Sequence, residues 1–190
     1  ALEAQAKRGI EHYWSRNGTR TQGIASGINT SNGLYRCTVQ ADINAKPSAK
    51  NFPLTENLTV DGGRSTSLGG FRVIHHNFGY WSVRRYPTFF ADEEFMHTAA
   101  HEFGHLVLNE YGDGGLIPHY SWSHKDTSTV LTQNRKDNHY ISATGELDVM
   151  HYFTEDPVGE AAWLDFWDRS SISEQDVKGL LWLSRVEFND

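Results

Sequence analysis

Five consecutive residues of this 190-residue chain carry its clearest chemical pattern. His101, Glu102 and His105 form an H-E-x-x-H sequence that Phe103 and Gly104 complete. On a helix, residues four apart lie on one face with their Cβ atoms about 5–6 Å apart. Two imidazoles at that spacing can bind one Zn²⁺, and the neighbouring carboxylate, about 100° around the helix, can reach the metal's open coordination position. The pattern predicts that Glu102 is the general base for a zinc-bound water that attacks a carbonyl carbon.

A catalytic zinc needs a third protein ligand, and several residues after the motif could supply it. The metzincin pattern is disfavoured because Leu108 and Tyr111 stand where it requires Gly and His or Asp. The remaining candidates are Asp113, His119, His124, Glu146, Asp148, His151 and Glu155. We favour Glu146, because a helical segment there would place this acidic ligand on one face with the apolar Met150. Asp148 could then orient a ligand imidazole without itself binding the metal.

Three other histidines are interpreted as structural, exposed or adjacent to the site, and four further residues could stabilise an oxyanion. His97 precedes His101 by four residues, but Thr98 stands where a base would be needed, so we interpret His97 as a neighbour of the site. His75 and His76 would point to opposite faces of a strand and are interpreted as structural or exposed. Candidates for stabilising the oxyanion that follows water attack are His119, Tyr120, His124 and Tyr152.

Hydrophobic periodicity predicts the helices that position these residues. The motif helix is expected over about 92–111, with Asp92 as its N-cap. An amphipathic helix is expected over 2–15, with Leu2, Ala6, Ile10 and Tyr13 or Trp14 on one face. Further helices are expected over 158–168 and from Ser173, where Ser-Glu-Gln-Asp fits a capping box. The last helix is expected to turn inward Val177, Leu180, Leu181 and Leu183.

The expected β-structure lies upstream of the motif. Residues 34–43 alternate apolar and polar side chains after the turn signal Asn32-Gly33, which predicts a strand with Cys37 as a small buried residue. Gly70–His75 and Tyr80–Arg84 are expected to pair as a hairpin. Residues 145–153 are expected to form a short helix or turn, and residues 115–140 a long polar loop. These elements predict an α+β fold in a single domain over residues 1–190, with a small sheet, a central H-E-x-x-H helix and C-terminal helices.

Composition limits the classes of partner. The formal net charge of −7 argues against a nucleic-acid partner, which requires clustered Lys and Arg. No apolar run approaches the roughly 18 residues needed to cross a bilayer. The single cysteine excludes an internal disulfide, and the first residues show no signal-peptide pattern.

Several segments resemble one known group of proteins. The H-E-x-x-H sequence and the five residues Leu108-Asn109-Glu110-Tyr111-Gly112 are similar to the zinc-peptidase toxin domains at the C-termini of bacterial VgrG spike and Rhs-type proteins. The similarity continues in residues 9–17, 120–125, 127–129 and 145–150. The resemblance implies a zincin-like fold in which His101, His105 and Glu146 bind zinc. The resemblance does not extend to residues 41–64.

The resemblance also implies a biological role. A toxin of this group would be delivered by a type VI secretion machine into the periplasm of a competing bacterium, so the secreted domain would be carried by the spike and would need no signal peptide. The expected partners are a protein or peptide substrate in the target cell, a covalently linked or docked spike, and an immunity protein.

Three functions are compatible with the motif. The leading one is a zinc-dependent metallopeptidase that hydrolyses peptide bonds. The second is a non-enzymatic structural-zinc module, which would need a fourth protein ligand such as His124 or Asp113. The third is a metal-dependent amidase that acts on cell-wall peptides. The sequence favours an enzyme, because a structural site does not require Glu between the two histidines.

Overall fold

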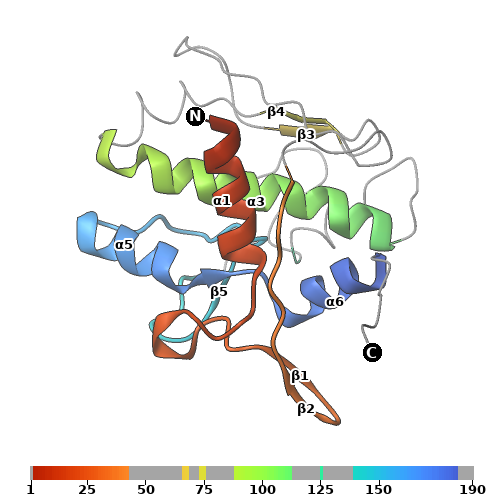
Figure 1. Cartoon of the computed structure of the whole chain (residues 1–190). Helices are drawn as coiled ribbons and strands as arrows, with labels where there is room; N and C mark the ends of the chain where they lie inside the picture. The colour runs from red at the N-terminus through yellow and green to blue at the C-terminus, as the bar shows by residue number, and fades with distance from the viewer. Residues whose placement is uncertain are drawn as a thin grey trace. The chain divides into compact units, whose positions relative to one another are not determined.

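Helices and short two-stranded ladders alternate along the chain in an α+β arrangement (Figure 1). The computed structural model describes residues 2–42, 66–68, 73–75, 88–112, 125 and 139–183. The chain divides into two units: unit 1 comprises Ala1–Ser15 and Thr38–Leu106, and unit 2 comprises Arg16–Cys37 and Val107–Asp190. The expected mixture of helices and small sheets is confirmed, while the single domain over residues 1–190 stays a prediction.

Unit 1 begins with α1 (Leu2–Trp14), which confirms the predicted N-terminal helix. The helix is buried along a different face from the one predicted. Its buried residues are Gln5, Gly9, Tyr13 and Trp14, whereas Leu2, Ala6 and Ile10 are only half-buried. Gly9 explains this shift, because a Cβ at that position would lie 2.2 Å from the carbonyl oxygen of Met96. Only glycine allows the backbone of α1 to approach so closely.

The long helix α3 (Thr88–Gly112) carries the H-E-x-x-H residues near its middle, as predicted. It begins four residues earlier than expected, so Asp92 lies inside the helix and its prediction as N-cap is wrong. Residues 88–91 contain neither Gly nor Pro, the residues least compatible with a helix interior, so nothing in this stretch ends the helix.

A short ladder also belongs to unit 1. β3 (Thr66–Leu68) pairs antiparallel with β4 (Val73–His75). The predicted strand over 70–75 is confirmed for residues 73–75, which pair with the segment before them. The predicted partner, Tyr80–Arg84, lies outside the described residues, as do His76 and most of residues 115–140.

The first part of unit 2 folds as a hairpin. After the 3-10 turn η1 (Thr21–Gly23), β1 (Ile28–Thr30) pairs antiparallel with β2 (Gly33–Tyr35) through a two-residue turn. Gly33 follows that turn with a φ of +127°, which favours glycine. The turn signal at Asn32-Gly33 is therefore confirmed.

The predicted strand over residues 34–43 is wrong for residues 36–42, and residue 43 lies outside the described residues. Leu34 and Tyr35 are 52% and 55% exposed, so the alternating side chains have no buried face to hold a longer strand. Pairing resumes only at Cys37, whose backbone forms an isolated antiparallel bridge with Arg16. Cys37 is half-buried, not fully buried as predicted, and this partial burial raises the pKa of its thiol.

The second part of unit 2 contains another ladder. β5 (Leu147–Asp148) pairs in parallel with β6 (Ser170–Ser171), and Val149 and Met150 form a turn after β5. The predicted helix over 145–153 is therefore wrong, although its alternative, a turn, is present at 149–150. Pairing with a distant strand decides the backbone conformation here, which local periodicity could not predict.

Two helices complete unit 2 and confirm the predicted C-terminal helices. α5 (Glu160–Arg169) is followed by α6 (Glu174–Leu183). The predicted start of this helix at Ser173 is confirmed. Ser173 Oγ accepts the Asp176 N–H at 3.3 Å, which is one of the two bonds of a capping box, and donates to the Asp176 carboxylate at 2.9 Å. Val177 is fully buried as predicted and Leu180 is half-buried, but Leu181, in the last turn, is 41% exposed. The prediction that Leu181 points inward is wrong.

Both units contain buried apolar side chains. Tyr13, Trp14 and Ala100 are fully buried in unit 1, as are Leu108, Met150, Ile172 and Val177 in unit 2. Among the residues that the structure describes, no helix combines the length and the apolar character required to span a membrane.

Candidate metal centre

The H-E-x-x-H residues lie on α3 within unit 1. The imidazole rings of His101 and His105 have centroids 4.7 Å apart and planes at 88° to each other. The two side chains are 8% and 6% exposed, and Glu102 is 6% exposed. The structure thus brings two imidazoles side by side, with a carboxylate on an adjoining residue, in a region largely removed from solvent. Electrostatic interactions are stronger in such a region than in water.

Further polar side chains are buried on the same helix. Glu94 is 8% exposed and Thr98 is 9% exposed. They precede His101 by seven and three residues, which keeps them on the same side of a helix with 3.6 residues per turn. Burying polar groups costs free energy unless hydrogen bonds or ligands compensate. Glu94, Thr98, His101 and His105 therefore form a buried polar stripe along one side of α3.

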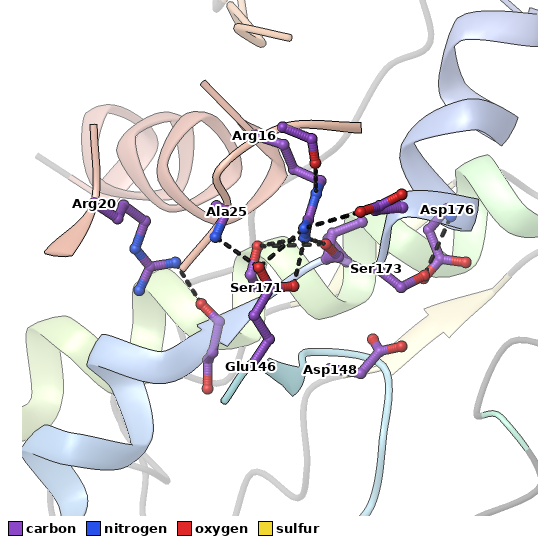
Figure 2. Close-up of polar contacts among 12 residues, drawn as sticks. Arg16, Arg20, Ala25, Glu146, Asp148, Ser171, Ser173 and Asp176 are labelled. Atoms are coloured by element: carbon purple, nitrogen blue, oxygen red, sulfur yellow. Dashed lines mark hydrogen bonds and ion pairs between the residues drawn. The ribbon is translucent and has the colours of Figure 1, made fainter. Parts of the chain in front are cut away.

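Glu146, the predicted third ligand, lies in unit 2 directly before β5. Its Oε2 accepts a hydrogen bond from Arg16 Nη1 at 2.8 Å, and its Oε1 accepts from Arg16 Nη2 at 2.9 Å and from the Ala25 N–H at 2.8 Å (Figure 2). An ionised carboxylate offers about four lone-pair sites, so these bonds leave about one, on Oε2. The predicted helical face shared with Met150 is wrong, and Arg16 orients the carboxylate instead.

Arg16 is the centre of the polar contacts in unit 2 (Figure 2). Its side chain is 3% exposed, its Nε donates to the Gly27 carbonyl at 2.8 Å, and its Nη1 donates to the Ile172 carbonyl at 2.8 Å. Glu146 is its paired counter-ion, and a Glu174 carboxylate oxygen lies 3.9 Å from Nη2. A buried guanidinium requires such compensation. Glu146 therefore contributes to the stability of unit 2 independently of any metal.

Two more arginines hold the same region of unit 2. Arg20 donates to three carbonyl oxygens at the end of α5, those of Trp167, Asp168 and Ser170. A cation at a helix C-terminus also interacts favourably with the helix dipole. Arg169 donates to the carbonyl oxygens of Ser142 and Gly145, so it fixes the chain just before Glu146.

Asp148, predicted to orient a ligand imidazole, belongs to a partly buried polar cluster of unit 2. Its Oδ2 lies 3.8 Å from Lys125 Nζ and 4.0 Å from His151 Nε2, and Lys125 also contacts Asp176 at 2.5 Å. Burial and the negative charge of Asp176 raise the pKa of Asp148 to about 7. Burial and the positive charges of Lys125 and His139 lower the pKa of His151 to about 4, so its imidazole is neutral at pH 7.

The other predicted site residues are only partly described. Asp113, His119, Tyr120 and His124 lie outside the described residues. Glu155 is exposed and Tyr152 half-buried in unit 2. Within the described part of the chain, no three His, Cys, Asp or Glu side chains are grouped so that they could hold a metal ion. The His101–His105 pair is thus the part of the predicted site that the structure brings together, and the third ligand stays a prediction.

Sequence reasoning missed the roles of Arg16, Arg20 and Lys125. The contacts of Arg16 span 11, 130 and 156 residues of sequence, and those of Arg20 span 147 to 150. No periodic pattern or short motif signals partners at such separations. Composition does not single out these residues either, because each is one of 17 Lys and Arg residues in the chain.

No model of a known protein family, no curated protein and no solved structure matches this chain.

Proposed function

We propose that this chain is a zinc-dependent metallopeptidase with a zincin-like fold. The observation that carries the proposal is the buried pair of adjacent imidazoles, His101 and His105, with Glu102 on the same turn of α3. Imidazole nitrogen is a donor that suits Zn²⁺. Two imidazoles one helical turn apart, with a glutamate directly after the first, are typical of metal-dependent hydrolases.

The residues of α3 have separate parts in the proposed reaction. His101 and His105 would hold the metal, which when bound would supply Lewis-acid activation of a peptide carbonyl and of a water molecule. Glu102, about 100° around the helix from His101, accepts the proton of the attacking water and donates it to the leaving nitrogen. Because Glu102 is 6% exposed, few competing waters surround its carboxylate during this transfer.

Glu146 is the proposed third ligand. The support is chemical: carboxylate oxygen is a common zinc donor, and about one lone-pair site on Oε2 is not used by Arg16 or Ala25. A carboxylate held in one orientation by a paired guanidinium loses little further freedom when it binds a metal.

The proposed biological setting is an antibacterial effector. Its support is the similarity to spike-borne toxin domains of residues 9–17, 101–105, 108–112, 120–125, 127–129 and 145–150. In this proposal a type VI secretion spike delivers the domain to the periplasm of a target bacterium, where a protein or peptide is the substrate. An immunity protein is the further partner that this setting requires.

The proposed mechanism is tested by Glu102→Gln, with Glu93→Gln, also on α3, as the matched control. We expect Glu102→Gln to keep one zinc per chain and to lose about 100- to 10,000-fold in peptide hydrolysis, the range associated with a general base. The control should keep both zinc and activity. Undiminished hydrolysis by the zinc-loaded Glu102→Gln protein would contradict the mechanism.

The substrate class is tested separately by incubating the zinc-loaded protein with unfolded protein and with purified peptidoglycan. The proposal predicts new peptide fragments from the unfolded protein. Release of peptides from peptidoglycan alone would replace the peptidase with a cell-wall amidase.

A further inference from the structure

Within unit 1, α1 crosses α3 and contacts it at successive turns (Figure 1). At the first contact, Gly9 lies against the backbone of Met96. One turn further along α1, the Tyr13 ring meets the His97 ring edge-on, with centroids 5.3 Å apart and planes at 83°. These contacts bring the end of α1 to the turn of α3 that begins the H-E-x-x-H sequence.

Trp14, the last residue of α1, contacts that turn in two ways. Its side chain is fully buried, and its indole N–H donates to the carbonyl oxygen of Ala100 at 3.0 Å. Its ring also meets the ring of Phe103 edge-on, with centroids 5.0 Å apart and planes at 83°. Ala100 directly precedes His101, and Phe103 lies between the two histidines. Trp14 is thus attached both to the backbone just before the motif and to a side chain within it.

Trp14 cannot act as a ligand, because indole N–H is only a donor. It also contacts a different face of α3 from the one that carries the imidazoles. Ala100 and Phe103 lie on one helical face, whereas His101 and His105, four residues apart, lie on another. Its effect on a metal must therefore act through the position and rotation of the helix.

From these contacts we infer that Trp14 is a positioning residue of the metal centre. Its indole N–H holds the Ala100 carbonyl, and with it the rotation of the turn that presents His101 and His105. A ligand pair must be held within about 0.5 Å and 10–20° of its productive geometry, so a fixed helix rotation matters for affinity. This inference rests on the proposed zinc site.

The test is Trp14→Phe, which keeps an aromatic ring against Phe103 and removes the donor to Ala100. Tyr13→Phe is the matched control, because Tyr13 is equally buried, lies on the same helix and also contacts α3. Zinc affinity is measured by competition with a chromophoric chelator, and ligand geometry by the visible absorption of the Co²⁺-substituted protein. Both are measured well below the melting temperature of each variant.

We expect Trp14→Phe to weaken zinc binding by about tenfold, the lower end of effects seen for residues that orient metal ligands, and to shift the Co²⁺ bands. Tyr13→Phe should change neither. A Trp14→Phe protein that melts at a lower temperature but keeps wild-type zinc affinity and Co²⁺ spectrum would overturn the inference while leaving the proposed function intact. A wild-type protein that binds no zinc would overturn both.

A second measurement does not depend on how well the variant folds. In the ¹⁵N-labelled wild-type protein, the assigned indole N–H resonance of Trp14 should shift when zinc is added, because the turn that accepts its hydrogen bond carries two ligands. The indole resonance of Trp163, in unit 2, is the internal reference. A Trp14 resonance unchanged by saturating zinc would contradict the inference.

Discussion

Two polar groupings of this molecule are built in opposite ways. In unit 1, His101, Glu102 and His105 come from one turn of one helix. Their side chains carry nitrogen and oxygen atoms that can coordinate a metal ion. In unit 2, Arg16 and Glu146 come from positions 130 residues apart. There the N–H groups of the Arg16 guanidinium donate hydrogen bonds to oxygen atoms of the protein itself. The first grouping can serve a ligand, whereas the second consists largely of contacts that stabilise the fold.

The difference teaches how to separate effects on chemistry from effects on stability. A change in the α3 grouping should alter metal binding and hydrolysis with little change in the folding of unit 2. A change at Arg16 should mainly lower the free energy of unfolding. Glu146 belongs to the second grouping by its contacts and to the first by the sequence-based prediction, so it is the residue that tests the distinction.

The largest expected effect is that of Arg16→Ala on stability. This change leaves Glu146 without its counter-ion and also removes donors from the Gly27 and Ile172 carbonyls, which should cost about 3–5 kcal/mol. The melting temperature should fall by about 6–20 °C, given 2–4 °C per kcal/mol for a chain of this size. Arg20→Ala, which loses bonds to the carbonyl oxygens of Trp167, Asp168 and Ser170, should lower the melting temperature less than Arg16→Ala. Equal losses in the two variants would contradict a special role for the Arg16 pair.

The next effect is that of His105→Ala on zinc affinity. Dividing the roughly 10–16 kcal/mol of a four-ligand zinc site among its ligands gives a loss of about 100- to 1000-fold in affinity. Isothermal titration of the metal-free protein measures it. His12→Ala, at an exposed histidine of α1, should leave the affinity unchanged. If both variants bound zinc like the wild type, the metal would lie elsewhere.

The elements that sequence could predict are those built by local periodicity. α1, α3, α5 and α6 all follow apolar repeats or a capping signal within a few residues of the predicted bounds. The same periodicity was less able to tell which face is buried. On α1 the close approach of Gly9 to Met96 decides the buried face, and that contact depends on a residue 87 positions away.

The candidate site shows the same limit. The pairing of His101 with His105 could be predicted, because it needs only the geometry of one helix. The environment of Glu146 could not, since it depends on Arg16, Ala25 and the pairing of β5 with β6. Hydrogen bonds between distant segments leave no periodic trace in a single sequence.

The substitution Glu146→Gln tests whether Glu146 acts as a metal ligand or only as the counter-ion of Arg16. If Glu146 is a ligand, replacing its charged oxygen with a neutral amide should weaken zinc binding by about 10- to 100-fold. Because the amide also presents an N–H group to Arg16, the melting temperature should fall as well. A lower melting temperature with unchanged zinc affinity would assign Glu146 to the fold alone and would move the third ligand to another of the predicted candidates.

The smallest expected effect concerns pH. The pKa of His151 is lowered from 6.5 to about 4 in the folded state, so the unfolded chain binds the proton first, and stability falls as pH drops from about 6.5 to 4. Asp148, whose pKa is raised to about 7, acts in the opposite direction, because its contribution to stability falls as pH rises from about 4 to 7.

His151→Gln should therefore remove the acid-side loss and move the pH of maximum stability downward. Since His151 is partly exposed, the loss avoided at pH 4 is about 1–2 kcal/mol, or roughly 2–8 °C in melting temperature. Calorimetry of the metal-free protein between pH 4 and pH 8 measures this change. Parallel pH profiles for the variant and the wild type would contradict the assigned burial of His151.

The central claim is that two imidazoles of α3 bind the metal, and X-ray absorption of the zinc-loaded protein tests it most directly. We predict two imidazole nitrogens at about 2.0–2.1 Å, with the remaining positions taken by oxygen. In His101→Ala, imidazole scattering should drop to one ring or zinc should be lost. A zinc site without imidazole scattering, or one that keeps its full imidazole signal in that variant, would contradict the account.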